Sequence, residues 1–459
     1  KSINMKKILQ GILTSTIVMF TAACDDELKP DNFSGQLTET VTAKPVNDFL
    51  NSIGINTAIY TRGETLDKTI ECVKYCGFRW VRAGYEGTAF FNNGVFQKLH
   101  DETGVLFSYG MGSGGTDTAR VMADARKLHE MGAFLAFESL NEPNNWGIIW
   151  DGEAGGGENS WLPVAKFQRD FYARVKSDPV MSQYPMFGIS TIGAENDNVG
   201  LQYLTIPEGA GTLMPDGTQY YDYGNCHNYA FGGDNDVLRD NQTWLASSPG
   251  NDNPFDGPYG NFVKTWAKGF LGYDEETVVN MPRVSTETGV TIHTGVDEDM
   301  QGRMFLNIYL SQFKRGWAYT SIYILRDRID EGGNQTYGFY APGYVARKAA
   351  HYIHNFTTIL ADDRDKSTTA GTLTYSIPKK PETVHHLLLQ KTTGKYYLII
   401  WGERYTGGTN NISISFDQNM SSVKVYDPTI GTEAISTHNN TGSISLEMGV
   451  DIAILEIEK

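Results

Sequence analysis

Residues 133–144 read AFLAFESLNEPN, and the class of fold follows from how this segment ends. Its first half is an apolar run typical of a buried strand, and Asn141, Glu142 and Pro143 come directly after it. Proline cannot donate to the hydrogen-bond ladder of a sheet, so Pro143 marks the end of the strand. Amphipathic stretches lie on both sides of the segment, which predicts one strand of a parallel sheet connected through helices.

The same alternation of short apolar runs and longer amphipathic stretches extends over most of the chain. Eight strands are expected, near Ile53 to Ile59, Phe78 to Gly84, Val105 to Gly110, Phe134 to Asn141, Met186 to Ile192, Tyr221 to Tyr229, Arg283 to Thr288 and Ala318 to Leu325. Eight helices are expected to follow them, at Leu66 to Cys76, Phe91 to Glu102, Thr118 to Met131, Ala165 to Lys176, a short one near Leu201, Phe262 to Phe270, Met300 to Phe313 and Tyr344 to Leu360.

Eight strands and eight helices within about 310 residues are the count of a (β/α)8 TIM barrel, which we place at residues 46–361. A doubly wound open sheet is the alternative. It would need a glycine-rich phosphate-binding turn after the first strand, and residues 55–64, INTAIYTRGE, do not provide one.

After about Asp362 the pattern changes to short alternating segments separated by Gly, Asn and Pro. About seven such strands in under 100 residues predict an antiparallel β-sandwich over residues 362–459. Its aromatic residues Tyr396, Tyr397 and Trp401 suit either core packing or glycan binding. Packing is favoured, because alternating aromatic residues are typical of sandwich cores.

The first 23 residues have the pattern of an export signal. Lys6 and Lys7 precede an uncharged stretch from Ile8 to Phe20, which is too short to span a membrane as a mature helix. The following Thr21, Ala22, Ala23 and Cys24 resemble a bacterial lipobox, which implies cleavage before Cys24 and lipidation of its sulfur. A plain secretory signal with a stray cysteine is the alternative.

The acidic residues 25–27 resemble the surface-export signal of Bacteroidetes lipoproteins. That resemblance implies a cell-envelope address: an outer-membrane lipoprotein exposed at the surface and held at the membrane by its lipid anchor only. The polar, aperiodic residues that follow are expected to be a tether, so that residues 24–45 connect the anchor to the barrel.

The composition of the 459-residue chain limits its partners. A formal net charge of -16 argues against nucleic-acid binding, which needs Lys and Arg to neutralise phosphates. The 25 Tyr, 22 Phe and 8 Trp suit stacking against flat ligands. Beyond Cys24, the cysteines are Cys72, Cys76 and Cys226, and we expect buried, inert thiols rather than a metal site or a disulfide. No metal or organic cofactor is implied.

Two carboxylates occupy the expected catalytic positions of the barrel. Active-site residues of TIM barrels lie at the carboxyl ends of the strands, where Glu142 follows the fourth strand and Glu287 ends the seventh, PRVSTETG. Glycoside hydrolysis requires such a pair, one acid to protonate the leaving oxygen and one carboxylate to attack or to position water. A structural role is the alternative for each: Glu142 as a helix-capping acid, and Glu287 as an ion-pair partner of Arg82 or Arg283.

These segments resemble the clan A glycoside hydrolases. FESLNEPNNW (residues 137–146) is similar to the strand-four motif of family 39, whereas STETG (285–289) and CHNY (226–229) are closer to family 5. The resemblance implies that Glu142 is the general acid/base, Glu287 the nucleophile and Asn141 a ligand of the sugar 2-hydroxyl. It further implies that His227 and Tyr229 flank the nucleophile and that Arg82 lies beneath it.

Two further positions bear on this resemblance. Glu138 shares the inward direction of Glu142, and we expect a buried structural carboxylate paired with an arginine. Near the end of strand eight the clan usually has a tryptophan, and this chain offers Tyr323 and Arg326 there instead.

Long loops between residues 144 and 161 and between 230 and 260 are expected on the catalytic face. They carry Trp146, Trp150, Trp161 and Trp244, which are candidate stacking platforms for sugar rings or else pack their own loops.

The sequence therefore predicts a retaining glycoside hydrolase whose carboxyl groups lie about 5–5.5 Å apart, with Glu142 kept protonated by burial and repulsion while Glu287 stays ionised. Its substrate would be a poly- or oligosaccharide. The alternative is a non-catalytic, surface glycan-binding lipoprotein on a TIM-barrel scaffold.

Overall fold

The computed structural model describes residues 39–61, 63–83, 87–191, 198–231, 237–255, 257–258, 273–328 and 335–459. The expected signal peptide, Cys24 and the tether up to residue 38 lie outside the described residues, as does the helix expected at 262–270. Among the described helices, none is both long enough and apolar enough to cross a membrane.

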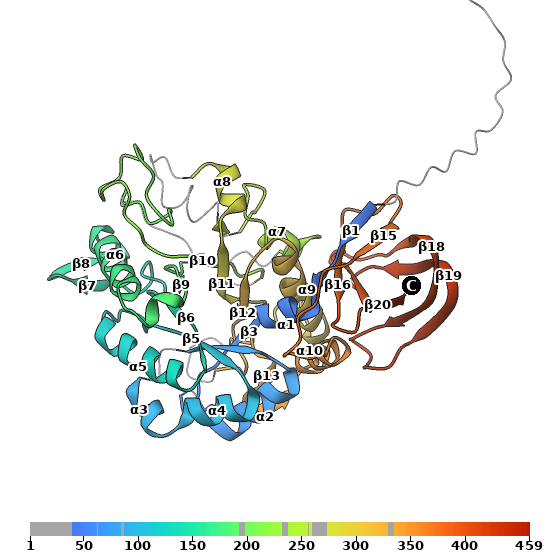
Figure 1. The fold of residues 1–459 in the computed structure, drawn as a ribbon, viewed down its shortest axis with the longest axis horizontal. Coiled ribbons are helices and arrows are strands. Elements are labelled where there is room, and N and C mark those ends of the chain that lie inside the picture. Colours follow the sequence, from blue (N-terminus) through green and yellow to red (C-terminus); the bar gives the residue numbers. More distant parts are fainter. Residues whose placement is uncertain are drawn as a thin grey trace, which may run out of the picture. The chain divides into compact units, whose positions relative to one another are not determined.

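A parallel eight-stranded sheet forms the barrel (Figure 1). Its strands in chain order are β3 (Ile53–Asn56), β4 (Trp80–Ala83), β5 (Leu106–Gly110), β6 (Phe134–Glu138), β9 (Met186–Phe187), β10 (Gly224–His227), β11 (Arg283–Thr288) and β12 (Tyr319–Ile322). Each strand pairs with the next, β12 returns to β3, and a parallel bridge between Phe187 and Tyr223 joins β9 to β10. The predicted TIM barrel is therefore confirmed, with β9 and β10 shorter than expected.

Helices surround the sheet because each has one apolar face. They are α1 (Val46–Ser52), α2 (Leu66–Cys76), α3 (Thr88–Asn92), α4 (Val95–Thr103), α5 (Thr118–Glu130), α6 (Leu162–Lys176), α7 (Gln242–Ala246), α8 (Glu275–Asn280), α9 (Glu298–Lys314) and α10 (Lys348–Ile359). Several start at aspartate caps, such as Asp117 on α5 and Asp297 on α9, whose side chains accept a backbone N–H of the first turn. The short helix expected near Leu201 is absent from the described residues 198–220, which form turns and irregular chain.

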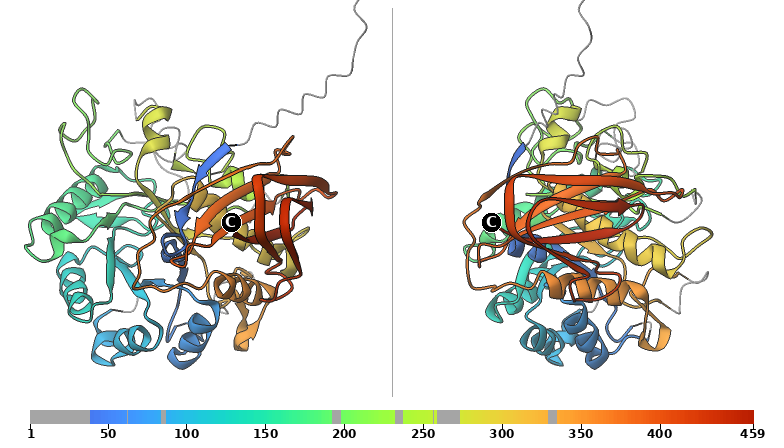
Figure 2. Two further views of the ribbon diagram at one scale, coloured as in Figure 1. Left: turned by 45° about the vertical axis from the view of Figure 1, so that its right-hand side comes forward. Right: turned by 90° about the vertical axis from the view of Figure 1, so that its right-hand side faces the viewer.

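The C-terminal strands form a second sheet, as the predicted β-sandwich requires (Figure 2). They are β15 (Thr372–Ser376), β16 (Val384–Gln390), β17 (Tyr396–Gly402), β18 (Asn410–Tyr426), β19 (Ser436–Met448) and β20 (Ile452–Glu458). Two of the short alternating segments, NISISF (411–416) and SVKVYD (422–427), are expected as separate strands but belong to the single long strand β18, which ends at Tyr426. A register shift between Ser415 and Met420 interrupts its pairing with β19.

Two short N-terminal strands complete this sheet. β1 (Glu39–Thr42) pairs antiparallel with β15, and β2 (Lys44–Pro45) pairs with β16. The expected tether thus differs from the structure over residues 39–45. The polar alternation of this segment, with Val41 and Ala43 directed at the sandwich core, suits an edge strand as well as it suits a linker.

The strands β16, β17 and β20 are buried on both faces. Leu388, Leu398 and Leu455 belong to the sandwich core, whereas their neighbours Leu387, Ile399 and Ile454 pack into the core that is continuous with the barrel. Tyr397 and Trp401 lie on that second side, so they pack as structural residues.

A buried carboxylate, Glu403, joins the sandwich to the barrel helices. It accepts hydrogen bonds from the backbone N–H of Trp244 (2.9 Å) and from the Ser311 hydroxyl (3.2 Å). Burial raises the pKa of Glu403, and these hydrogen bonds lower it by less. Two smaller hairpins, β7 (Ile148–Trp150) with β8 (Glu153–Gly155) and β13 (Tyr340–Ala341) with β14 (Val345–Ala346), lie outside both sheets.

Candidate active site

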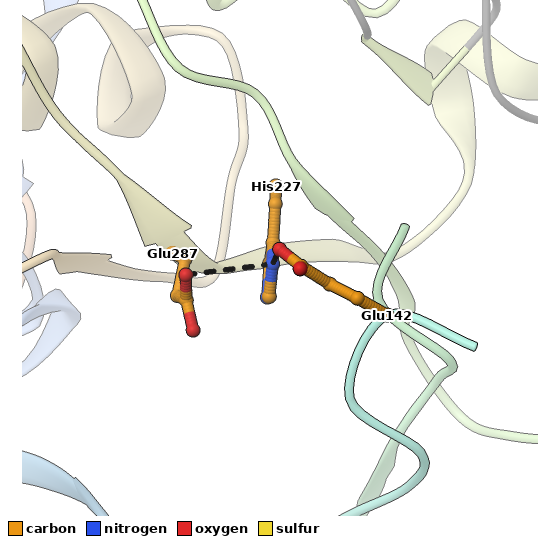
Figure 3. Close-up of side chains that lie close together, drawn as sticks. All are labelled: Glu142, His227 and Glu287. Atoms are coloured by element: carbon orange, nitrogen blue, oxygen red, sulfur yellow. Dashed lines mark hydrogen bonds and ion pairs between the residues drawn. The ribbon is translucent and has the colours of Figure 1, made fainter. Parts of the chain in front are cut away.

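The carboxyl ends of β6, β10 and β11 bring Glu142, His227 and Glu287 together, with the histidine between the two carboxylates (Figure 3). One side-chain oxygen or nitrogen from each residue lies within 4.8 Å of the others. His227 Nδ1 is 2.7 Å from Glu142 Oε1 and 3.7 Å from Glu287 Oε2. Both glutamates are 8% exposed.

Glu142 adopts an unusual backbone conformation, with φ at 43°. Left-handed backbone is uncommon for residues other than glycine and often marks functional sites. The Glu142 N–H donates to the Ser190 carbonyl at 2.9 Å, and the Glu142 carbonyl accepts from Asn145 and Trp146. The Asn145 side chain also donates to Glu142 Oε2 at 2.9 Å, a contact that no sequence motif predicts.

A bulge in β11 positions Glu287. β11 has one extra residue relative to both neighbouring strands. Val284 and Glu287 are three residues apart, but their partners on β10 are only two apart. In the same way, Ser285 and Thr288 are three residues apart and their partners on β12 are two apart. An inserted residue breaks the alternation of side chains along a strand. As a result Thr286 and Glu287, although adjacent, both reach side chains of the barrel interior.

Arg82 on β4 lies beneath the carboxylates of Glu142 and Glu287 and forms hydrogen bonds with three residues. Its guanidinium donates from Nε to both oxygens of Glu138, at 2.8 and 2.9 Å, and from Nη2 to the Asn141 oxygen at 2.8 Å. Its Nη1 donates to Glu287. The expected buried ion pair between Glu138 and an arginine is therefore present, and Glu287 contacts Arg82 from the other side.

Aromatic side chains cover the Glu287 side of the site. The Tyr229 hydroxyl donates to Glu287 Oε2 at 2.8 Å, and burial together with the neighbouring carboxylates raises the pKa of Tyr229 well above its ordinary value. Its ring meets Tyr337 edge-on at 5.4 Å and Tyr323 at 6.5 Å. Arg328 donates to the Tyr323 hydroxyl at 2.7 Å. The motifs did not point to Tyr337 or Arg328.

The pKa of Glu142 differs in direction from the expectation of a raised value. Burial does raise it, but the hydrogen bond and charge of His227 outweigh burial, with smaller contributions from Asn145 and Arg82, so the pKa is lowered. The lowered pKa favours the ionised form of Glu142, whereas the sequence predicted the protonated form.

The four loop tryptophans lie in different surroundings. Trp146 lies four residues after Glu142 and is 54% exposed. Trp150 packs edge-on against Phe167 of α6 at 5.0 Å. Trp161 is buried. Trp244 stacks on His385 at 4.1 Å and lies under the Arg315 guanidinium, so its ring serves the contact between barrel and sandwich.

The group of Glu142, His227 and Glu287 also has the residue types that bind metal ions. However, ligand atoms around an ion at about 2.1 Å lie roughly 3 Å or more from one another, because coordinated atoms keep apart. The 2.7 Å contact from His227 to Glu142 is a hydrogen-bond distance. The arrangement is suited to proton transfer between the histidine and a carboxylate.

No protein-family model matches the chain, and no curated protein matches it. Solved structures share its fold. A family 39 glycoside hydrolase from the gut symbiont Bacteroides cellulosilyticus WH2 superposes with a TM-score of 0.55 at 12% identity, covering 91% of this chain and 83% of that chain.

Two further structures are similar at the same level. The GH51 arabinofuranosidase from Xanthomonas axonopodis pv. citri has a TM-score of 0.52 at 10% identity and covers 92% of this chain and 100% of that chain. The catalytic domain of GH30 xylanase C from Talaromyces cellulolyticus has a TM-score of 0.51 at 12% identity, with 92% and 98% covered. The chain therefore has the fold of these glycoside hydrolases over nearly its whole length.

Proposed function

We propose that the protein is a retaining glycoside hydrolase that acts on a poly- or oligosaccharide. The observation that carries this proposal is the pair of carboxylates at the carboxyl ends of β6 and β11, with side-chain atoms within 4.8 Å of each other. Inverting enzymes hold their carboxyl groups about 6.5–9.5 Å apart to admit a water molecule, whereas direct attack on the anomeric carbon needs about 5–5.5 Å. The solved glycoside hydrolases of the same fold support this choice of chemistry.

The surroundings of each carboxylate support its role. Glu287 receives hydrogen bonds from Arg82 and Tyr229, which hold its carboxylate in place for attack. Glu142 contacts His227 and Asn145 and lies on the opposite side of the site, where it would protonate the leaving oxygen and later activate water. Asn141, oriented by Arg82, would bind a hydroxyl of the sugar, and the exposed Trp146 would stack on a sugar ring beside Glu142.

Stereochemistry tests the mechanism. The anomeric proton of the first-formed product, followed by NMR during hydrolysis, is expected to show the configuration of the substrate, and Glu287→Ala is expected to abolish turnover without unfolding the protein. Initial inversion would overturn the assignment of Glu287. A screen of the mature protein against plant and host polysaccharides would identify the substrate. The glycan-binding alternative is not favoured, because both carboxylates are in place; its mark would be binding without turnover in that screen.

We also propose that the chain is a lipoprotein of the outer membrane, attached through Cys24. The support is the sequence of residues 6–27 alone. Cys24→Ser is expected to move the protein from the detergent phase to the aqueous phase when cell fractions are partitioned. Unchanged partitioning of the variant would rule out lipidation at that sulfur.

A further inference from the structure

The Thr286 hydroxyl is surrounded by three polar side chains inside the barrel. Its oxygen lies 2.8 Å from Glu138 Oε1, 2.9 Å from Asn225 Nδ2 and 3.2 Å from His227 Nε2. A hydroxyl has one hydrogen to donate and two lone pairs to accept with. The direction of each of these three hydrogen bonds can therefore be assigned by elimination.

The two contacts other than His227 have fixed directions. The Thr286 oxygen has two acceptors within reach, Glu138 Oε1 at 2.8 Å and Asn225 Oδ1 at 3.3 Å. Glu138 is the nearer of the two and forms a buried ion pair with Arg82, so its carboxylate accepts the single Thr286 hydrogen. The Asn225 amide is oriented by the backbone, because its oxygen accepts the Thr286 N–H and its nitrogen donates to the Gly188 carbonyl. Its nitrogen therefore also donates to the Thr286 oxygen. Only a lone pair of Thr286 is left for His227, so His227 Nε2 carries a hydrogen.

This assignment determines what lies at the other ring nitrogen. A neutral imidazole with its hydrogen on Nε2 has a lone pair on Nδ1. A lone pair on Nδ1 and an ionised Glu142 would repel each other at 2.7 Å, so the contact must contain a second proton, shared between Nδ1 and Glu142 Oε1.

The charged groups around His227 favour this second proton. Glu142 and Glu287 face Nδ1 from β6 and β11, and Glu138 lies behind Thr286. Arg82, from β4, is the opposing cation, but it is already paired with Glu138 and Glu287. Tyr229 is neutral, because its pKa is raised. The lowered pKa of Glu142 agrees with a proton that rests on the histidine side of the contact.

Given the glycosidase activity proposed above, we infer that Thr286 is a positioning residue for acid catalysis: its hydroxyl holds His227 in the Nε2–H form, so that the hydrogen bond from His227 to Glu142 stores the proton for the leaving group. When the glycosidic bond breaks, its electron pair stays on the leaving oxygen, which takes the stored proton, while Glu287 forms the bond to the anomeric carbon. Glu142 is then an ionised carboxylate facing a lone pair. Their repulsion strengthens Glu142 as the base that takes a proton from water in the second step.

Nitrogen NMR of histidine-labelled protein tests the inference without any substrate. The His227 signals, assigned by their loss in His227→Gln, are expected to show a protonated Nε2 at every pH at which the protein is folded, with Nδ1 the nitrogen that titrates. A neutral His227 with its hydrogen on Nδ1 would overturn the inference, whatever the enzyme hydrolyses.

Kinetics of two substitutions test the consequence. Thr286→Val keeps the shape and removes the hydroxyl, which frees His227 to place its only hydrogen on Nδ1 beside an ionised Glu142. The basic limb of the kcat/KM profile is then expected to move down by about one pH unit, the equivalent of one buried hydrogen bond. At neutral pH, substrates with poor leaving groups should lose about tenfold in rate, and activated aryl glycosides should lose less. Thr286→Ser, which restores the hydroxyl, should restore the profile.

Thr288→Val is the matched control, because Thr288 lies on the same strand as Thr286 but its hydroxyl donates to the backbone carbonyl of Asn228, after β10. It should leave the pH profile in place. An equal loss on both substrate classes with an unmoved basic limb in Thr286→Val would overturn the inference. If no glycoside is hydrolysed by the wild type, the proposed function fails, while the NMR result still decides where the His227 protons lie.

Discussion

The ion pair of Arg82 with Glu138 provides a test of how charges are held inside this barrel. Both side chains are 3% exposed, and Arg82 also donates to Glu287 and Asn141. We predict that Arg82→Met strongly destabilises the protein, because it leaves the Glu138 carboxylate buried without its cation.

Removing one partner of a buried ion pair costs about 3–5 kcal/mol, well above the cost of breaking a surface pair. At roughly 2 °C per kcal/mol for a large domain, the melting temperature should fall by about 6–10 °C in calorimetry. Lys98→Met is the control. Lys98 contacts Asp67 at 2.6 Å, but the two side chains are 47% and 78% exposed, so its loss should cost less than about 1 kcal/mol.

A double-mutant cycle gives the decisive result. In Arg82→Met with Glu138→Gln, no uncompensated charge remains between the two positions, so the double variant should be destabilised by clearly less than the sum of the two single variants. Effects that add to within about 0.5 kcal/mol would show that Arg82 and Glu138 do not depend on each other, and would refute the reasoning.

Three other predictions concern the site and the barrel–sandwich contact. Tyr229→Phe removes the hydrogen bond to ionised Glu287, worth about 1.5–3 kcal/mol, so kcat/KM should fall by roughly 10- to 100-fold with the fold intact; an unchanged kcat/KM would remove Tyr229 from the site. Glu142→Ala should slow substrates with poor leaving groups by about 10²–10⁴-fold but spare the first step of activated aryl glycosides, so that hydrolysis of the glycosyl enzyme becomes rate-limiting and azide restores turnover; absence of any azide effect together with equal losses would contradict an acid/base role. Burial and nearby cations lower the pKa of His385 to about 2. Below about pH 6.5, His385 is therefore protonated in the unfolded chain but stays neutral in the folded protein. The free energy of unfolding should therefore fall with decreasing pH, by about 1.4 kcal/mol per pH unit more than in His385→Gln. If the free energies of unfolding of the two proteins change in parallel with pH, the prediction is wrong.

Much of the barrel could be predicted because a parallel sheet has a simple pattern. Apolar runs such as residues 133–137 mark strands that are buried on both faces, and the polar residues after them must gather at one end. Glu142, His227 and Glu287 follow three different strands, and this rule alone brings them together. The pairing of Glu138 with an arginine could also be predicted, since an interior carboxylate needs a cation.

The remaining features depend on geometry that no periodic pattern encodes. Strict alternation along β11 would direct Thr286 away from the face of Glu287, and only the bulge brings both into the interior. The direction of the Glu142 pKa shift depends on a 2.7 Å contact with a residue 85 positions away. Trp244 was expected in a loop of the catalytic face, but it lies on the short helix α7, and its ring is covered by Arg315 and His385.

The pairing of β1 with β15 has a consequence for how the protein is made. Glu39 pairs with Tyr375, so β1 cannot pair with β15 until more than three quarters of the chain has been synthesised. Pairings between such distant residues form slowly, because a long loop must close before any contact is gained. A fragment that ends at residue 361 would keep every strand of the barrel but would expose the face that β16, β17 and β20 cover, together with the unpaired β1. The barrel and the sandwich are therefore expected to mature as one cooperative body.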